Sequence, residues 1–430
     1  MNNQKISTQP YKGTIDMYPQ DIQERNYLFN IWTKVAKKFG YEEYDTPTIE
    51  DVEIYKAKSG EDIANKQLFN FTDKAGREVA LRPEMTPSLA RMVTAKRNEL
   101  IFPLRWFNIG KFFRYEKPQK GRTREFFQLN IDLLGLPPIE PEIEIITFVL
   151  EVMKELRASE NTYELRINSR ELFNYFTDEI LLLTEDKKST LAKAIDNYLK
   201  MSKKDFIEYL AEIGLDNQEQ EKVLQYINWS ITDLEKIESK CSGAKQILEI
   251  LKEFEDRKEV KFAPYVMRGL DYYTGIVIEM YDIGSKENPR ALFGGGRYDS
   301  LLEIFGKEKI EAFGLGWGDK TTMEYLRANN LLPKYSSEID VYITLMSKDL
   351  LKESKEIATY LRENNINTLV QTIPNKLGKQ LKYADRKSIP WVIVIGEEEV
   401  KKGIVQLKDM KNKESFEIKK EDIIDRIKRL

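Results

Sequence analysis

The chain has 430 residues, 41% of them hydrophobic and 32% charged, which predicts a globular protein of two or three domains with apolar cores. Its single cysteine and complete lack of histidine exclude an intrachain disulfide, a cysteine-rich zinc site, a histidine general base and a histidine-ligated metal. The formal net charge of −3 indicates neither a uniformly basic nor a uniformly acidic protein. We find neither a signal-peptide pattern nor a run of the ~18 apolar residues that span a membrane, so we expect a cytoplasmic protein without a membrane segment.

The lack of histidine also narrows the chemistry that is available. Arginine, lysine, tyrosine and carboxylates remain, together with Mg²⁺ held by oxygen ligands. This set suits reactions at phosphate, in which positioning and charge stabilisation matter more than proton transfer. Loss of histidine by drift in a proteome rich in Lys and Ile is an alternative that the sequence leaves open.

The first part of the chain alternates helical and strand periodicity. Four patterns follow one another: a helix over Gln20–Phe39, a hairpin over Lys66–Leu81, a helix over Thr86–Ala95, and two strands within Arg105–Leu134. The segment YEEYDTPTIED, residues 41–51, is predicted to be extended. Antiparallel strands joined by loops, with helices between them, indicate an α+β fold.

The second part changes character twice. Ser169–Asp256 is rich in Leu, Lys and Glu at helical spacing, which predicts an inserted helical module, and strand patterns return at Tyr265–Met280 and Ala312–Trp317. Beyond the linker a β-α-β-α-β pattern predicts a small α/β domain with a mostly parallel sheet. The predicted organisation is an α+β domain on an antiparallel sheet over 1–330, with the helical insertion at about 169–256, a linker at 331–337 and the α/β domain over 338–430.

The loop between the two strands within Arg105–Leu134 is densely charged. The stretch RYEKPQKGRTREFFQ, from Arg114 to Gln128, contains five cations. Strand periodicity places Arg114 and Glu116 on one face, and Gln128 and Asp132 on one face of the return strand. The pattern fits a phosphate-bearing ligand, and it fits equally a solvated hairpin tip whose charges contribute little to stability.

Three more motifs combine glycine or proline with polar side chains. RGLDYYTG, Arg268–Gly275, puts an arginine beside a glycine, which allows close approach to an anion, although the segment is also a good strand former. FGGGRY, Phe293–Tyr298, lets the backbone approach a substrate, but a glycine run is often only a turn. In LRPEMTPS, Leu81–Ser88, Glu84 and Thr86 precede a helix, where a helix cap is the ordinary explanation.

The second domain contains a basic helix pattern. KLGKQLKYADRK, Lys376–Lys387, holds five bases and one acid, and Lys379, Lys382 and Arg386 lie near one face of the predicted helix. A basic face on a slightly acidic protein fits a phosphate-bearing partner, and it fits an ordinary solvated helix as well.

In series, these motifs resemble those of the histidyl-tRNA synthetases, a family of class II aminoacyl-tRNA synthetases. YDTPTIED resembles motif 1 of that class and RYEKPQKGRTREFFQ its motif 2, while RGLDYYTG and FGGGRYD are similar to the family's histidine-binding signatures. The segment KLGKQLKYADRKSIPWVIVIGEEEV is similar to the family's anticodon-binding domain. The resemblance runs from about Tyr11 to about Met410, and it implies a class II catalytic domain, an anticodon-binding domain and a homodimer.

The resemblance implies a reaction in which L-histidine and ATP, with Mg²⁺, form a histidyl adenylate whose histidyl group passes to the 3′ end of histidine tRNA. By resemblance the catalytic residues are Arg114 and Arg268. The implied histidine-binding residues are Glu84, Met85, Thr86, Arg114, Gln128, Asp132, Arg268, Tyr272 and Tyr273. The implied ATP-binding residues are Arg114, Glu116 and Arg122, and the residues that meet the tRNA acceptor end are Lys117 and Gln119. The sequence assigns no metal-ligating residue.

Two positions depart from the family pattern. Many relatives carry Glu in place of Asp132, which the resemblance assigns with Tyr273 to the imidazole ring. The motif 3 arginine that holds the ATP γ-phosphate in many relatives corresponds to Asp319, so Lys320 and Arg122 are the candidate replacements. Two other functions stay open at this point: a non-aminoacylating paralogue that regulates histidine biosynthesis, and a tRNA-sensing module.

Overall fold

The computed structural model describes residues 6–56, 67–119, 121–267, 272–284, 291–306 and 309–428. The chain divides into two compact units, Met1–Leu332 and Pro333–Leu430, and the division falls within the stretch predicted as a linker. The predicted fold class is confirmed, because a largely antiparallel sheet dominates the first unit and a mixed sheet with helices makes up the second.

Strands and helices alternate along the first unit. The strands are β1 (Glu42–Glu43), β2 (Ile49–Asp51), β3 (Phe69–Thr72), β4 (Glu78–Leu81), β5 (Leu104–Phe113), β6 (Glu125–Leu134), β7 (Tyr163–Ser169), β8 (Val260–Phe262), β9 (Ile276–Asp282), β10 (Ala291–Arg297) and β11 (Ala312–Gly318). The helices are α1 (Pro19–Lys38), α2 (Glu53–Lys56), α3 (Thr86–Ala95), α4 (Glu140–Glu155), α5 (Arg170–Tyr175), α6 (Glu185–Asp196), α7 (Lys203–Glu212), α8 (Asn217–Tyr226), α9 (Ile231–Glu235), α10 (Ser242–Glu253) and α11 (Asp319–Ala328). Shorter helical turns are η2 (Phe176–Ile180), η3 (Tyr198–Lys200) and η4 (Leu301–Phe305).

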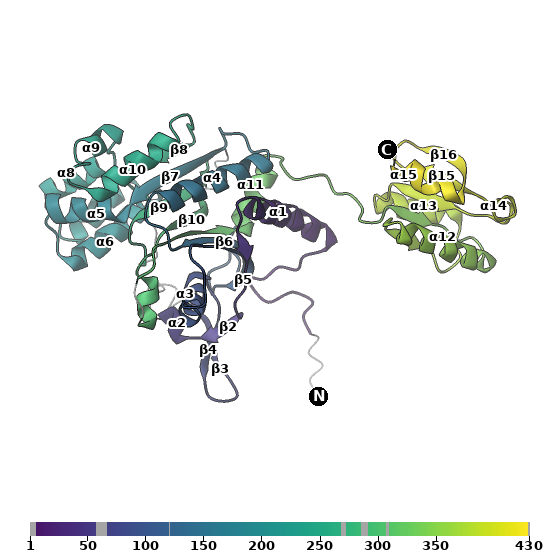
Figure 1. The fold of residues 1–430 in the computed structure, drawn as a ribbon, viewed down its shortest axis with the longest axis horizontal. Helices are drawn as coiled ribbons and strands as arrows, with labels where there is room; N and C mark the ends of the chain where they lie inside the picture. The colour runs from purple at the N-terminus through teal and green to yellow at the C-terminus, as the bar shows by residue number, and fades with distance from the viewer. Residues whose placement is uncertain are drawn as a thin grey trace. The chain divides into compact units, whose positions relative to one another are not determined.

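The central sheet has eight strands in the order β1-β5-β6-β11-β10-β9-β7-β8. Neighbouring strands are antiparallel from β5 to β7, and the outer pairs β1–β5 and β7–β8 are parallel. Leu129, Ile131 and Leu133 on β6 are buried in the main apolar core with residues of α1 and α4. Figure 1 shows α1, α4 and α11 beside this sheet. The alternate residues of β6 therefore form the opposite, polar face of the strand.

Helices α5 to α10 form a continuous helical module between β7 and β8. Because β7 and β8 pair with each other in the sheet, the module is an insertion between two neighbouring strands. Its interior is aromatic: the rings of Phe176 and Tyr226 stack at 4.2 Å, and Trp229 packs edge-on against both. Phe176 and Tyr226 belong to the main apolar core and Trp229 packs against it, so the module continues the core of the first unit.

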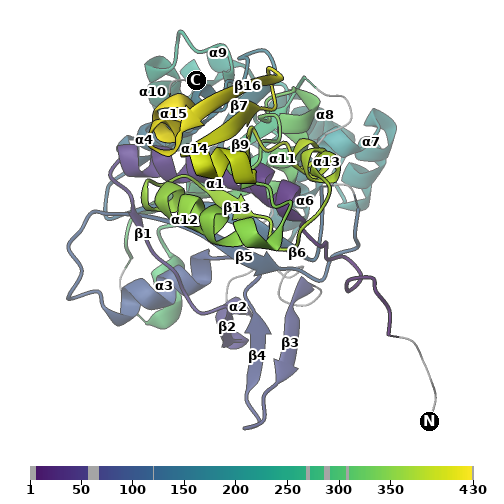
Figure 2. The ribbon, with the colours of Figure 1, turned by 90° about the vertical axis from the view of Figure 1, so that its right-hand side faces the viewer.

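The hairpin of β3 and β4 pairs with β2 in a separate three-stranded sheet. Its turn is closed by the Asp73 carboxylate, which accepts hydrogen bonds from the backbone N–H groups of Ala75 and Arg77. Gly76 supplies the positive φ of 81° that this turn requires. The hairpin projects from the body of the first unit in both Figure 1 and Figure 2.

The structure differs in two places from what the glycine-rich motifs indicated. A strand was expected over Tyr265–Met280, but β9 begins only at Ile276, and residues 268–271 lie outside the described part of the chain. The run FGGGR, for which a turn was an alternative, is part of strand β10. Glycine has a low strand propensity, but here ladders to β9 and β11 on both sides hold the backbone extended.

The second unit is a five-stranded sheet in the order β13-β12-β14-β15-β16. Its strands are β12 (Val341–Ile343), β13 (Thr368–Val370), β14 (Trp391–Val394), β15 (Ile404–Asp409) and β16 (Glu414–Lys419). Its helices are α12 (Leu351–Glu363), α13 (Leu377–Arg386), α14 (Glu397–Lys402) and α15 (Ile423–Lys428), with short turns η5 (Lys348–Leu350) and η6 (Lys420–Asp422). The first three strands are parallel as predicted, and the antiparallel β15–β16 hairpin was not foreseen. Helices α12 and α13 pack on separate apolar clusters formed by alternate residues of β12, so they cover opposite faces of the sheet.

Candidate active site

A cavity of about 960 Å³ lies on the polar face of the central sheet. Directly paired residues of antiparallel strands share a face, so one line crosses the sheet through Asn130, Gly316, Gly294, Glu279 and Arg166. All five residues line the cavity. Because the two glycines have no side chain, the middle of this line is only backbone. The sheet therefore forms a trough with polar side chains along both sides.

Glycine is required at several floor positions, because neighbouring side chains fill the space of a Cβ atom. A Cβ on Gly316 would lie 2.3 Å from Gln128 Nε2, and a Cβ on Gly314 would lie 2.4 Å from Asp132 Oδ1. The glycines of β11 thus allow the polar side chains of β6 to lean across the neighbouring strand.

Four polar residues meet at one side of the trough. Glu84 is buried and accepts a hydrogen bond of 3.0 Å from the Tyr272 hydroxyl. Gln128 donates from Nε2 to Asn130 Oδ1 at 2.6 Å. Helix α3 begins at Thr86 without a side-chain cap, so the helix-cap explanation for Glu84 is wrong. This side offers a buried carboxylate and an amide, a pair suited to an ammonium group.

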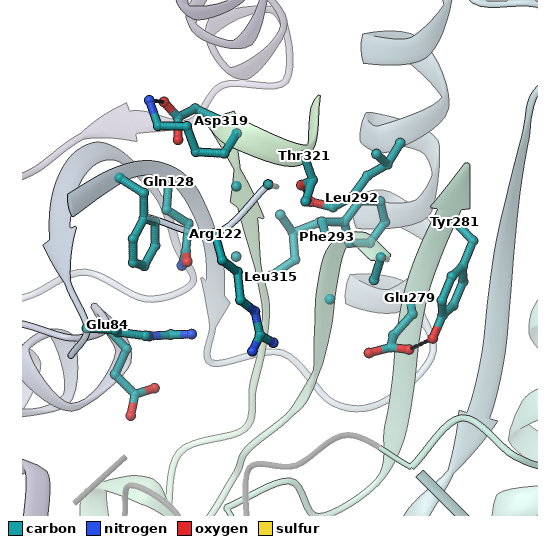
Figure 3. Close-up of a pocket in the computed structure, with 18 of the residues that line it drawn as sticks. Glu84, Arg122, Gln128, Glu279, Tyr281, Leu292, Phe293, Leu315, Asp319 and Thr321 are labelled. Atoms are coloured by element: carbon teal, nitrogen blue, oxygen red, sulfur yellow. Dashed lines mark hydrogen bonds and ion pairs between the residues drawn. The ribbon is translucent and has the colours of Figure 1, made fainter. Parts of the chain in front are cut away.

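Two arginines of the charged loop region line the cavity. Arg114 donates from Nε to the Pro83 carbonyl at 2.9 Å and lies over the Phe126 ring, which fixes the guanidinium plane. Arg122 forms an ion pair of 3.0 Å with Glu116, and Figure 3 shows its side chain directed into the cavity. The loop therefore places positive charge inside the site, which favours the phosphate-ligand interpretation over a merely solvated tip.

Asp132 lies behind the cavity wall. Its carboxylate accepts hydrogen bonds from the Tyr298 hydroxyl at 2.5 Å and from the Tyr44 hydroxyl at 3.4 Å. Burial raises the pKa of Asp132 to about 7, although both hydroxyl donors oppose that shift. Tyr298 lines the cavity and Asp132 does not. Tyr298 therefore connects the Asp132 carboxylate to the cavity.

The other side of the trough carries carboxylates and an arginine. Tyr281 donates its hydroxyl hydrogen bond to Glu279, and Figure 3 places this pair across the cavity from Gln128 and Glu84. Arg166 stacks on the Tyr281 ring at 4.2 Å and pairs with Glu164 at 2.7 Å. These residues lie on β7 and β9, toward the helical module.

Asp319, the residue in place of the motif 3 arginine, is almost completely buried at the start of α11. It accepts a hydrogen bond of 3.0 Å from the Phe127 backbone N–H and pairs with Lys320 at 3.2 Å. Burial raises the pKa of the Asp319 carboxyl. Lys320 lines the cavity and also an adjoining cavity of about 360 Å³. A structural role for Asp319, which joins α11 to β6 and orients Lys320, follows from these contacts.

The structure brings together most of the residues proposed from the sequence. Those that line the cavity are Glu84, Thr86, Arg114, Glu116, Gln119, Arg122, Gln128, Tyr272 and Tyr273. Met85 is buried in an adjacent apolar cluster, and Lys117 is exposed outside the lining. Arg268 lies outside the described residues. Tyr272 and Tyr273 both line the cavity, because they precede β9 and lie outside the strand, in which adjacent side chains would face opposite ways.

Sequence reasoning missed two residues that shape the site. Tyr298 stood within the quoted FGGGRYD but was given no role. Arg82, flanked by a leucine and a proline, is buried and donates to Asp45 Oδ1 and the Thr46 carbonyl at 2.7 Å each, and to the Lys111 carbonyl at 3.0 Å. It thereby joins the extended segment after α1, the segment before Glu84 and strand β5. The sequence offered one signal of this role: Arg82 is a charged residue between two apolar neighbours.

Comparison with known proteins identifies the family. The sequence pattern of histidyl-tRNA synthetases matches residues 13–318, and that of the anticodon-binding domain matches residues 340–430. The chain belongs to the histidyl-tRNA synthetase family. The histidine–tRNA ligase of Leptospira biflexa is 38% identical over 100% of this chain and 99% of its own length. That of Pyrococcus furiosus is 32% identical over 97% of this chain and 98% of its own length.

A solved structure supports the fold assignment independently. The histidyl-tRNA synthetase of Nostoc sp. PCC 7120 superposes with a TM-score of 0.83, covering 99% of this chain and 100% of that one at 22% identity. In the described part of this family member, no helix has the length and apolar character to cross a membrane. The same residues contain no cluster of three or more acidic or cysteine side chains arranged for a metal ion.

Proposed function

We infer that this chain is a histidine–tRNA ligase, which activates L-histidine with ATP and attaches it to histidine tRNA. The observation that carries this inference is the full-length match to ligases of that name at 32% and 38% identity. The match of residues 340–430 to an anticodon-binding domain disfavours a regulatory paralogue, because a regulator that charges no tRNA has no need of such a domain.

Activation needs no histidine side chain in the protein. The carboxylate of the substrate is already ionised at neutral pH, so it attacks the α-phosphorus of ATP without a general base. A new bond forms between the carboxylate oxygen and phosphorus, the bond to the β-phosphate oxygen breaks, and pyrophosphate leaves with the electron pair. The site must therefore neutralise crowded oxyanions, and we assign this role to Arg114 and, by resemblance, to Arg268.

We assign the outer phosphates of ATP to Arg122 and Lys320. Arg122 reaches into the cavity from the loop, and Lys320 stands at the start of α11, where the motif 3 arginine is absent. Mg²⁺ is expected to accompany ATP, and when bound it neutralises triphosphate charge. The buried Glu279 offers it an oxygen ligand beside those of the phosphates and water.

Selection of histidine requires partners for both ring nitrogens. A neutral imidazole has one N–H donor and one bare acceptor nitrogen. We propose that Tyr273 donates to the bare nitrogen, and that the Tyr298 oxygen, whose own hydrogen points to Asp132, accepts from the ring N–H. Glu84 and Gln128 are placed for the α-amino group, with Thr86 beside them. A ligand without matching groups leaves these buried partners unpaired, which costs roughly 10⁴-fold in discrimination.

The remaining family features enter as proposals. We propose that Lys117 and Gln119 meet the acceptor end of the tRNA, that the enzyme is a homodimer, and that it acts in the cytoplasm. Gln119 lines the cavity, and Lys117 is an exposed residue two positions before it, which supports a contact of this loop with the tRNA.

Histidine-dependent exchange of pyrophosphate into ATP tests this function. The wild-type chain is expected to catalyse exchange with histidine and with no other common amino acid. Arg114→Ala should lower the exchange rate about 10²-fold, the scale of removing one oxyanion donor. Arg77→Ala, an exposed arginine of the β3–β4 turn, serves as the control and should leave the rate unchanged. A wild-type chain that binds histidine tRNA but shows no exchange would instead be a tRNA-sensing module.

A further inference from the structure

A short N-terminal segment lies against the charged loop of the site. This strap, residues 11–17, begins with a turn in which the Thr14 backbone N–H and hydroxyl both donate to the Tyr11 carbonyl, at 2.9 and 2.7 Å. Gly13 supplies the φ of 88° that such a turn requires at its third position. Tyr11 and Ile15 are 57% and 61% exposed. Burial of the strap therefore contributes little to the stability of the first unit.

Arg124, on the return side of the charged loop, holds this strap. Its side chain is buried, and Nη1 donates to the Tyr11 hydroxyl at 3.0 Å and to the Lys12 carbonyl at 3.3 Å. Its backbone N–H donates to the Gly13 carbonyl at 2.7 Å. The guanidinium group also lies over the Tyr115 ring, 3.9 Å from the ring centroid. One buried residue thus contacts three successive residues of the strap.

The same arginine holds the opposite side of the loop. Its Nε donates to the Glu116 carbonyl at 3.2 Å, and its backbone carbonyl accepts from the Arg114 N–H at 3.0 Å. The Glu116 carboxylate in turn forms the 3.0 Å ion pair with Arg122. Glu116 and Arg122 line the cavity, whereas Arg124 does not. Arg124 therefore fixes, from outside the cavity, the residue that orients Arg122.

We propose that Arg124 is a positioning residue, which fastens the strap to both sides of the charged loop and so holds Glu116 and Arg122 in the orientation that binds the outer phosphates of ATP. Cations crowded on one loop repel one another, so the loop needs a fixed support to keep a single conformation. When Arg122 is held in place before the triphosphate arrives, binding does not have to order it, and the affinity is higher. The proposal rests on the proposed function, because it takes ATP as the ligand.

Two glycines offer a matched test. A Cβ atom on Gly13 would lie 2.8 Å from Cγ and Cδ of Arg124 and 3.0 Å from Pro118 Cγ, so Gly13→Ala should push the strap away from the loop. Gly76, in the β3–β4 turn, has a similar φ of 81°, but a Cβ atom there would meet no atom within 4 Å. Gly76→Ala therefore carries a similar backbone strain without the displacement.

Calorimetric titration of the full chain with ATP and with AMP measures the effect. Gly13→Ala should weaken ATP binding roughly tenfold, the scale of one lost hydrogen bond to a charged group, and should leave the affinity for AMP, which has no outer phosphates, within about twofold of wild type. Gly76→Ala should match wild type with both nucleotides. Arg124→Lys keeps the charge but loses the planar fork of donors, so it should repeat the ATP-specific loss by an independent change.

Equal weakening of ATP and AMP binding by Gly13→Ala would overturn the proposal, because the strap would then support the whole site and not the contacts to the outer phosphates. Equal effects of the two glycine substitutions, or unchanged ATP binding in both Gly13→Ala and Arg124→Lys, would overturn it as well. Each of these results leaves the proposed function intact when wild type exchanges pyrophosphate in the presence of histidine. A wild-type chain without exchange contradicts that function itself.

Discussion

A hydrogen bond joins Tyr298, at the wall of the cavity proposed to bind histidine, to the Asp132 carboxylate behind it. If both act on the imidazole through the Tyr298 oxygen, Tyr298→Phe and Asp132→Asn should each raise the KM for histidine about tenfold, because a buried polar partner is lost. The double variant should be hardly worse than either single variant, since the second change removes nothing further. The KM for ATP in the exchange assay serves as the internal control. Additive effects, or a much larger effect of Asp132→Asn, would show that Asp132 contacts the ring itself.

The raised pKa of Asp132 also makes a prediction about stability. A carboxyl that titrates at about 7 when folded, and near 3.9 when unfolded, binds a proton more tightly in the folded state. The folded protein therefore loses stability, through this group, as the pH rises from about 4 to about 7, and loses no more above that. The free energy of unfolding, measured with urea and without ligands, should therefore fall for wild type relative to Asp132→Asn as the pH rises from about 4 to about 7. A constant difference between the two proteins would mean that Asp132 ionises normally.

Strand β10 and helix α4 are joined by a buried ion pair. Arg297 donates from Nε and Nη2 to the two carboxylate oxygens of Glu142, at 2.7 and 2.9 Å, and both side chains are almost fully buried. Because Glu142→Gln leaves the buried Arg297 with only the partly exposed Asp299 as a counter-charge, it should lower the free energy of unfolding by about 3–5 kcal/mol. Lys34→Ala, which removes an exposed pair with Glu155, should cost less than about 1 kcal/mol. Similar losses of unfolding free energy in both variants would show that the Arg297–Glu142 pair does not hold β10 against α4.

Elements with a strong local pattern could be predicted from the sequence. The α3 helix begins and ends where its periodicity placed it. On β6 the core residues Leu129, Ile131 and Leu133 alternate with the polar Gln128, Asn130 and Asp132. The glycine run of β10 could not be recognised as a strand, because its extended backbone depends on neighbouring strands far away in sequence. The partnership of Asp132 with Tyr298 was equally hidden, since it joins β6 to the end of β10 across the whole helical insertion. Family resemblance supplied the candidate residues, and only the folded chain shows which of them line one cavity.

At the scale of the whole molecule, the lack of histidine has a consequence for synthesis. An enzyme that produces histidyl-tRNA, and that contains no histidine, needs none of its own product to be translated. During histidine starvation, pulse labelling should show continued synthesis of this chain. A variant with histidine at exposed helical-module positions, Lys204→His, Glu208→His and Lys245→His, should decline like other histidine-containing proteins. If synthesis of wild type and of the variant declines at the same rate, the lack of histidine does not protect synthesis of this chain during starvation.

Charging of histidine tRNA by the purified full chain tests the proposed function most directly. With ATP and labelled histidine, we predict that label becomes ester-linked to the 3′ end of histidine tRNA, with one AMP released for each histidine attached. No other amino acid should label this tRNA. Histidine-dependent exchange without any label on the tRNA, or labelling by a different amino acid, would contradict the assignment of this chain as a histidine–tRNA ligase.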